Sequence, residues 1–346
     1  MERRRSWNPS GLITVHEDAI GQNIGLNGAR VRVRKWGFLV IRRATTNSQG
    51  FFITSSTRTK RVKYSVFFKN NPLFVVKAGT VFWNARDIGH RTHKREAWRR
   101  HFQGGIKQFY GLIHNAAYDY YTRIVQTYNI QHPGYYKKIV GKDWYNTSSH
   151  HLNNIGATFA LYDIRITRGS GGAYRGSDGI YATTVHELTH ASHRNLDSGM
   201  FSVFESGSNN RLLIMESWAE GVETIVTNDR YNIIANNYQS SRAIDNGGRW
   251  NSFRQRRTAL NMNEYTPFVE DLIDNLNQNN NNSLWPLDRV NGYNLNQIQN
   301  SIDDCRDIDC IERKLINNFE GNPTENRLNE MFNYVREVRN NAANWD

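Results

Sequence analysis

The chain has 346 residues, which is long for a single hydrophobic core and predicts two domains. Its 38% hydrophobic content excludes global disorder, and no apolar run reaches the ~18–20 residues that a membrane-spanning helix needs. The formal net charge of +12 would favour nucleic acid, anionic membranes or acidic glycans as partners. Because Lys and Arg are spread along the chain without a zinc-finger, RRM or KH pattern, we interpret it as a basic protein with no specific nucleic-acid partner.

The start of the chain and its cysteines leave the cellular compartment open. The basic stretch 1–7 is not followed by the apolar segment of a secretory signal, so either the protein stays inside the cell or a leader is missing from this sequence. The two cysteines, Cys305 and Cys310, are close enough in sequence for a small disulfide, and two reduced thiols are an equally good interpretation.

Residues 1–80 are predicted to form an all-β domain. Short apolar or alternating runs follow one another from about residue 9, with turns at 27–28 and 48–50. The runs 28–33 and 45–52 resemble the "G-A-x-V-x-V" strand and the "T-x-x-x-G-x-F" hairpin of the carboxypeptidase-regulatory-like family, which has a transthyretin-type sandwich. This resemblance implies a spacer or attachment domain without catalytic residues.

Residues 81–103 lose the strand pattern, and their basic and aromatic side chains predict a connection to a second domain over 104–346. Apolar residues at three- and four-residue steps predict a core helix over 104–128. Strands are expected at 137–140, 157–162 and 163–167, and a flexible glycine-rich link at 168–179. The chain is thus predicted to be a multidomain α+β protein, with a β-sandwich followed by a mainly helical domain that contains a small sheet.

The helix predicted over 180–195 carries the motif with the clearest chemistry. His186, Glu187 and His190 follow the H-E-x-x-H pattern, in which two histidines one helical turn apart bind zinc. Glu187 is then the general base that takes a proton from a zinc-held water. A solvated helical face without metal is the alternative. His193 does not complete the longer H-E-x-x-H-x-x-G-x-x-H motif, because residue 196 is Leu, so it is either a packing residue or a substrate contact.

A second predicted helix, over 211–226, places Glu216, Glu220 and Glu223 on nearly one face. Three carboxylates on one face repel one another unless a cation or other partners compensate them. The pair Glu216 and Glu220 resembles the glutamate helix of gluzincin zinc peptidases, where the first acid binds the metal and the second orients a histidine ligand. The resemblance implies that Glu216 is the third zinc ligand and Glu220 the orienting acid. An exchange of roles between the two acids stays open.

The rest of the chain offers weaker signals. Tyr231, Tyr238 and Arg242 are candidates to stabilise an oxyanion, and no spacing rule selects one of them. Structural helices are predicted over 265–276, 295–319 and 325–338, with an Asn-rich surface loop over 277–282.

The stretches 181–193 ("Y-A-T-T-x-H-E-L-x-H-A-S-H") and 216–219 ("E-S-W-A") together resemble a group of secreted or lipid-anchored proteins of Bacteroidetes-type bacteria. These proteins join a regulatory-like sandwich to a zincin domain, which implies an extracytoplasmic location. We therefore predict a gluzincin-like zinc metallopeptidase with Zn²⁺ as cofactor and a protein or peptide as substrate. The alternatives are a surface binding or adhesion module with a structural or catalytically lapsed zinc site, and a zinc hydrolase that acts on another substrate.

Overall fold

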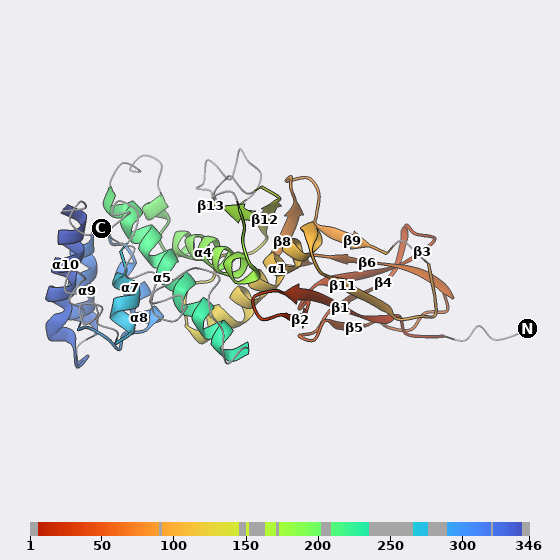
Figure 1. The fold of residues 1–346 in the computed structure, drawn as a ribbon, viewed down its shortest axis with the longest axis horizontal. Coiled ribbons are helices and arrows are strands. Elements are labelled where there is room, and N and C mark those ends of the chain that lie inside the picture. The colour runs from red at the N-terminus through yellow and green to blue at the C-terminus, as the bar shows by residue number, and fades with distance from the viewer. Residues whose placement is uncertain are drawn as a thin grey trace, which may run out of the picture. The chain divides into compact units, whose positions relative to one another are not determined.

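The computed structural model describes residues 6–89, 92–144, 150–151, 163–170, 173–201, 209–234, 266–275, 289–319 and 321–340. Its strands come first in the chain and most of its helices follow, as the colours of Figure 1 show, so the predicted α+β order is confirmed. Contacts divide the chain into two compact units. The first comprises Met1–Asp119, Tyr135–Leu152 and Ala157–Thr184, and the second comprises Tyr120–Gly134, Asn153–Gly156 and Val185–Asp346.

Strand β1 (Ser10–Glu17) is the centre of the first sheet of the first unit. Every second residue of β1 from Gly11 to Glu17 is buried, as its alternating sequence requires. β1 pairs antiparallel with two strands and parallel with a third; these are β2 (Gln22–Gly25), β5 (Phe51–Ile53) and β11 (Trp98–Phe102).

The second sheet of the first unit is built around β3 (Arg30–Lys35) and β6 (Arg61–Phe67). Val31 and Val33 of β3 are fully buried, whereas the arginines between them are partly exposed. This alternation gives the sheet one apolar and one basic face. The remaining strands of the sheet are β4 (Leu39–Thr45), β9 (Arg86–Ile88) and β10 (His93–Lys94).

Aromatic side chains of these two sheets pack against each other. The ring of Tyr64 on β6 is stacked on Trp98 of β11, with 5.5 Å between ring centroids. Phe52 of β5 meets the same ring edge-on at 5.9 Å. Such contacts remove large apolar surfaces from water and hold the sheets face to face.

The segment 81–103 differs from the predicted connection, because it contains the three strands β9, β10 and β11. In β11 the buried Trp98 and Phe102 are separated by the charged or polar residues 99–101. Arg100 forms an ion pair with the buried Asp87 at 2.9 Å. The sequence did not reveal this strand, because Arg99, Arg100 and His101 separate its two buried residues and leave no clear alternation. Its partner β1 also lies far away in the sequence.

A third sheet of the first unit is mixed, with parallel pairs on both sides of β12. Helix α1 (Gly105–Asp119) contacts β8 and β12 of this sheet as well as β1. For this reason α1 belongs to the first unit, and the predicted boundary before residue 104 does not separate the two units. The strands are β7 (Lys69–Asn70), β8 (Phe74–Ala78), β12 (Lys137–Lys142), β13 (His150–His151) and β14 (Ile164–Thr167).

The glycine-rich stretch predicted as a flexible link contains a short hairpin, β15 (Gly169–Ser170) with β16 (Ala173–Tyr174). The strand expected at 157–162 lies outside the described residues, as do the loop 277–282 and both ends of the helix predicted over 265–276. Within that last range the structure places α7 (Phe268–Ile273). The predicted helix over 104–128 begins as α1 and continues as a π-helical turn, η1 (Tyr120–Ile124), and α2 (Val125–Thr127).

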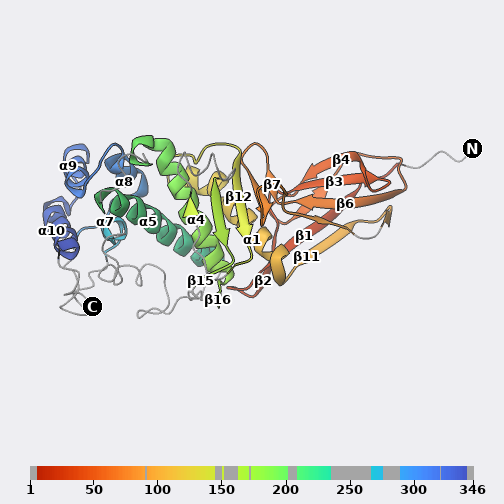
Figure 2. The same ribbon diagram turned by 90° about the horizontal axis from the view of Figure 1, so that it is seen from above.

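The helical part of the chain is organised around α4 (Ser177–Leu196) and α5 (Asn209–Ile234), which Figure 2 shows in green. α7 packs so closely on α5 that a methyl group at Gly221 would lie 2.3 Å from a side-chain carbon of Val269. In the part of the chain that the structure covers, no helix has the length and apolarity to cross a membrane. The other helices are η2 (Ser198–Phe201), α8 (Leu295–Ile302), α9 (Ile308–Asn318), η6 (Glu325–Arg327) and α10 (Leu328–Asn340).

We expect His114, in the core of the first unit, to make the protein acid-sensitive. Its side chain is fully buried, and Nε2 donates to the carbonyl of Asn27 at 2.8 Å. Burial lowers the pKa of His114 to about 4. A depressed pKa gives stability that is present above the ordinary value of 6.5 and is lost as the pH falls through 4, up to on the order of 3 kcal/mol. Urea unfolding at pH 7, 5.5 and 4.5 measures this loss.

The matched variants are His114→Gln, which keeps a donor for Asn27, and His101→Gln at an exposed position of the same unit. His114→Gln should flatten the decline between pH 6.5 and 4, and His101→Gln should leave it unchanged. An equally steep decline in His114→Gln would show that other groups control the acid sensitivity.

Candidate metal centre

Helix α4 brings His186 and His190 together, as the spacing predicts. Their Nε2 atoms are 3.0 Å apart, and both rings are largely removed from solvent. Thr184 and Thr189 point their hydroxyls back to carbonyls of their own helix, at 2.7 and 2.9 Å. These two threonine hydroxyls are therefore satisfied within the helix and do not compete for the two imidazoles.

That partner comes from α5. The carboxylate of Glu216 places Oε2 3.3 Å from Nε2 of His186 and Oε1 3.4 Å from Nε2 of His190. The three side chains form a group whose ligand atoms all lie within 4.8 Å of one another. The two histidines of α4 and the carboxylate of α5 are far apart in the sequence and meet at one point in the second unit.

The spacing of these atoms suits a small tetrahedral cation. Donor atoms at about 2.0–2.1 Å from a tetrahedral zinc ion are separated by roughly 3.3–3.4 Å. The two Nε2 atoms are 3.0 Å apart, and each has a different oxygen of Glu216 near it, Oε2 at 3.3 Å from His186 and Oε1 at 3.4 Å from His190. Two imidazoles and one carboxylate are also the donor set of many catalytic zinc sites. The residues fit zinc by both distance and chemistry.

The orienting role predicted for Glu220 falls mainly to Glu223. Oε2 of Glu223 accepts a hydrogen bond from Nδ1 of His186 at 3.0 Å, whereas Oε2 of Glu220 lies 3.5 Å from the same atom. Both acids are buried, and with His186 they form a second close group. Glu223 stands seven residues after Glu216, two turns along the same face, and this spacing was the signal that could have identified it.

The charges in this cluster are strongly coupled. Burial opposes a charged imidazole, yet hydrogen bonds and charge from Glu216 and Glu223 raise the pKa of His186 well above its usual value. Burial likewise opposes ionisation of Glu216, but His190 and His186 hold the pKa of Glu216 well below its usual range. The carboxylates therefore require positive charge at the imidazoles, which either protons or a bound cation can supply.

Glu187 differs from the other acids of the cluster. Its side chain is 4% exposed, and Oε2 has no hydrogen-bond partner among the described residues. Burial raises the pKa of Glu187 to about 7, although His186 and His190 act in the opposite direction. A carboxyl with a pKa near neutrality can both accept and release a proton at physiological pH.

The other two predicted site residues are placed differently. His193 is buried against Phe201, with 5.4 Å between ring centroids, and does not join the group formed by His186, His190 and Glu216. Tyr231 is fully buried on α5, fifteen residues after Glu216, and a helix of that length rises about 22 Å. The structure therefore does not bring Tyr231 to the group formed by His186, His190 and Glu216, and this placement gives no support to the oxyanion role predicted for it. Tyr238 and Arg242 lie outside the described residues.

The position of α4 is fixed by a buried hydroxyl network. The hydroxyl of Tyr120, in the π-helical turn η1, lies 2.9 Å from Oγ of Ser192 and 3.2 Å from Oγ1 of Thr189. This hydrogen bond gives the buried hydroxyl of Ser192 a partner. A buried tyrosine with an unpaired hydroxyl would cost free energy, so the hydroxyls of Ser192 and Thr189 favour the packing of Tyr120 against α4.

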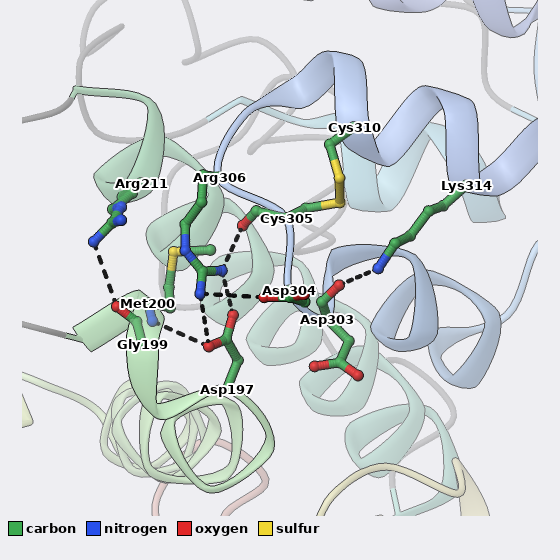
Figure 3. A network of polar contacts seen from close by, with 10 residues as sticks. All are labelled: Asp197, Gly199, Met200, Arg211, Asp303, Asp304, Cys305, Arg306, Cys310 and Lys314. Carbon is green, nitrogen blue, oxygen red and sulfur yellow. Dashed lines mark hydrogen bonds and ion pairs between the residues drawn. A yellow bond between two sulfur atoms is a disulfide. The ribbon is translucent and has the colours of Figure 1, made fainter.

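An ion pair holds the end of α4. Asp197, which follows the helix directly, accepts hydrogen bonds from both terminal nitrogens of Arg306, one of them at 3.0 Å (Figure 3). Arg306 also donates to the carbonyl of Cys305, and Cys305 is disulfide-bonded to Cys310. The question left open by the sequence is thus answered in favour of the disulfide. The bridge closes the segment that carries Arg306 between α8 and α9.

We expect Glu223→Gln to weaken zinc binding more than Glu220→Gln. Carboxylates that hold a histidine ligand typically contribute 10–100-fold to metal affinity. Glu223 makes the shorter contact with Nδ1 of His186, so its variant should lose affinity in that range, and Glu220→Gln should lose less. Titration against a zinc-binding dye measures both. An equal or reversed order would return the orienting role to Glu220.

Of the five side chains in the two close groups, the sequence analysis assigned a role to His186, His190, Glu216 and Glu220, and it missed the role of Glu223. A search with protein-family models and with curated protein sequences finds no match for this chain.

Proposed function

We propose that the protein is a zinc-dependent metallopeptidase of the gluzincin-like type. The observation that carries the proposal is the meeting of Glu216 with His186 and His190 within 3.4 Å, beside a buried Glu187 whose Oε2 is unpartnered. A structural zinc site would need only ligands. A buried carboxyl on the neighbouring helical position, free of the ligand groups, is the additional group that hydrolysis requires.

Each residue has a distinct task in this proposal. His186, His190 and Glu216 hold the metal, and Glu223 keeps the ring of His186 in place. A zinc ion bound there would supply Lewis-acid polarisation of a water and of the scissile carbonyl. Glu187 would accept a proton from the attacking water and would pass it to the leaving amine. Proton transfer of this kind contributes about 10²–10⁴-fold to the rate.

The location and the N-terminal domain belong to the same proposal. An extracytoplasmic site of action is supported by the disulfide between Cys305 and Cys310, because such bridges persist mainly in oxidising compartments. The two facing sheets around β1 and β3 support a sandwich of the carboxypeptidase-regulatory-like kind, which would act as a spacer or attachment domain.

The alternative of a binding module with a structural zinc site has less support. A structural site has its fourth position filled by a protein ligand, and His193, the nearby candidate for that place, does not join the ligand group. A zinc hydrolase acting on a non-peptide substrate would use the same residues, so the choice between the two depends on the substrate assay.

The experiment is metal analysis of the purified full chain combined with cleavage of a mixed peptide library. We expect about one zinc per chain, cleavage that a chelator abolishes, and recovery when zinc is added back. Zinc binding without cleavage of any peptide would exclude the peptidase and leave the binding module or another hydrolase. Absence of stoichiometric zinc would contradict the proposed metal centre itself.

A further inference from the structure

The positive charge of this chain is concentrated in one segment. Residues 19–86 contain thirteen Lys and Arg residues and no Asp or Glu, whereas the whole chain has a net charge of +12. The rest of the chain is therefore close to neutral. This corrects our interpretation of the cations as evenly spread, and the question becomes where the folded first unit places them.

Strand pairing gathers the cations on one side of the second sheet. Arg32 of β3 lies directly opposite Arg43 of β4, and directly opposed residues project from the same face. Arg30 pairs with Phe67 of β6, and Phe67 in turn pairs with Arg86 of β9. With Arg34, two residues beyond Arg32, and Lys69 next to Arg30, these side chains define what we call the basic face: Arg30, Arg32, Arg34, Arg43, Lys69 and Arg86.

The structure describes no ion pair between the basic face and a carboxylate. Among the residues that the structure describes, none of the six cations forms an ion pair, and the Nε atoms of Arg32 and Arg34 are buried without a hydrogen-bond partner. Burial, followed by the charges of Arg30, Arg34, Arg43 and Arg86, lowers the pKa of Arg32. Cations held close together at the cost of mutual repulsion are typical of a surface that meets an anion.

The basic face is also hollowed. A depression of about 450 Å³ is lined by Arg30, Arg43 and Lys69, together with neighbouring polar residues that include Thr45 and Asn70. It offers two guanidinium groups, an ammonium group, a hydroxyl and an amide. This is a donor set for a phosphate group, since guanidinium can bind two phosphate oxygens at once.

A second feature lies at the tip of the β3–β4 hairpin, at the end of the basic face. Trp36, Phe38 and Leu39 are 69%, 75% and 46% exposed. Trp36 adopts a positive φ of 56°, which is rare for a bulky residue and has a free-energy cost. Glycine or asparagine would adopt this backbone conformation with less strain, yet the position holds an exposed tryptophan. We call Trp36, Phe38 and Leu39 the apolar tip.

We propose that the basic face and the apolar tip together bind the surface of an anionic phospholipid membrane. Lipid phosphates would meet the cations, and the apolar tip would enter the interface, where tryptophan is enriched. Nucleic acid fits less well, because a base-binding surface has exposed aromatic rings among its cations. The ring on the basic face, Phe67, is buried beneath the guanidinium of Arg32 at 4.3 Å, and the exposed rings of Trp36 and Phe38 lie apart from it, beside the aliphatic Leu39 in the apolar tip. The proposal does not depend on the metal centre.

The test is sedimentation of the full chain with vesicles of phosphatidylcholine alone and of phosphatidylcholine with about one-third phosphatidylglycerol. We expect binding to the anionic vesicles that weakens as salt is raised, since each cation near an anionic surface contributes about fivefold. The double variant Arg30→Glu/Arg43→Glu should bind at least tenfold more weakly. Trp36→Ser/Phe38→Ser should also bind more weakly, by an amount that does not change with salt.

The matched control is Arg99→Glu/Arg313→Glu, which makes the same charge change at two exposed arginines outside the basic face. It should bind within about twofold of the wild type. Equal binding by neutral and anionic vesicles would overturn the proposal, as would equal losses in the control and in Arg30→Glu/Arg43→Glu. Binding to duplex DNA or heparin without binding to anionic vesicles would assign the basic face to another polyanion. Peptide cleavage is a separate measurement, so either proposal can fail alone.

Discussion

Replacing Glu187 with glutamine is expected to lower peptide cleavage by about 10²–10⁴-fold while zinc stays bound. Gln has nearly the same shape as Glu but cannot accept a proton from water. Glu187 has no role among the close ligand groups, so its loss should leave the metal site assembled. Cleavage rates and zinc content of the same preparation measure both effects.

The pKa of Glu187 gives this variant a second signature. Burial raises the pKa to about 7 in the protein without metal, so the contribution of this group to stability is present below its ordinary value of 4.5 and is lost as the pH rises through 7. Glutamine does not ionise, so the Glu187→Gln variant does not lose this stability as the pH rises. The zinc-free variant should therefore be less sensitive than the zinc-free wild type to a rise from pH 5 to 7, which thermal unfolding after chelation measures.

The control for both measurements is Glu96→Gln, whose side chain is 59% exposed in the first unit. It should match the wild type in cleavage, zinc content and stability. If Glu187→Gln retained full activity with zinc bound, the peptidase proposal would be rejected. If it lost zinc as well as activity, Glu187 would have to be counted among the groups that hold the metal.

Glu216→Ala is expected to have the second largest effect, the loss of zinc itself. Two imidazoles alone leave the site one protein ligand short of the three that catalytic zinc requires. The affinity should fall by more than the roughly 100-fold that an orienting acid contributes, and cleavage should fall with it. Zinc content after dialysis and dye competition at neutral pH measure the loss.

The same variant distinguishes the two acids that the sequence could not separate. Glu216 lies within 3.4 Å of Nε2 of both histidines, whereas Glu220 comes near the opposite nitrogen of His186. Glu220→Ala should therefore keep stoichiometric zinc at high zinc concentration, and Glu216→Ala should not. If the two variants exchanged this behaviour, Glu220 would be the ligand and Glu216 the orienting acid.

The ion pair at the end of α4 is a structural support rather than part of the chemistry. Asp197 is buried, and burial alone would raise the pKa of its carboxyl, but hydrogen bonds and charge from Arg306 lower it. Arg306 is held next to the bridge between Cys305 and Cys310. A segment from far along the chain thus stabilises the helix that carries His186 and His190.

What the sequence determined by itself is local. A helix repeats every 3.6 residues, so His186 and His190 had to share a face, and Glu216, Glu220 and Glu223 had to line another. The alternation in β1 and β3 likewise predicted strands with one buried face. These properties depend mainly on neighbours in the chain, which is why periodicity alone predicted them.

What only the tertiary structure decided involves elements that are remote in sequence. The choice of Glu223 over Glu220 depends on how α5 packs on α4, and a spacing of three or four residues fits both acids. The strand nature of 98–102 depends on β1, some ninety residues earlier, because a parallel partner must satisfy its backbone groups. The basic face also exists only because β3, β4 and β9 lie in one sheet, where opposed residues project to the same side.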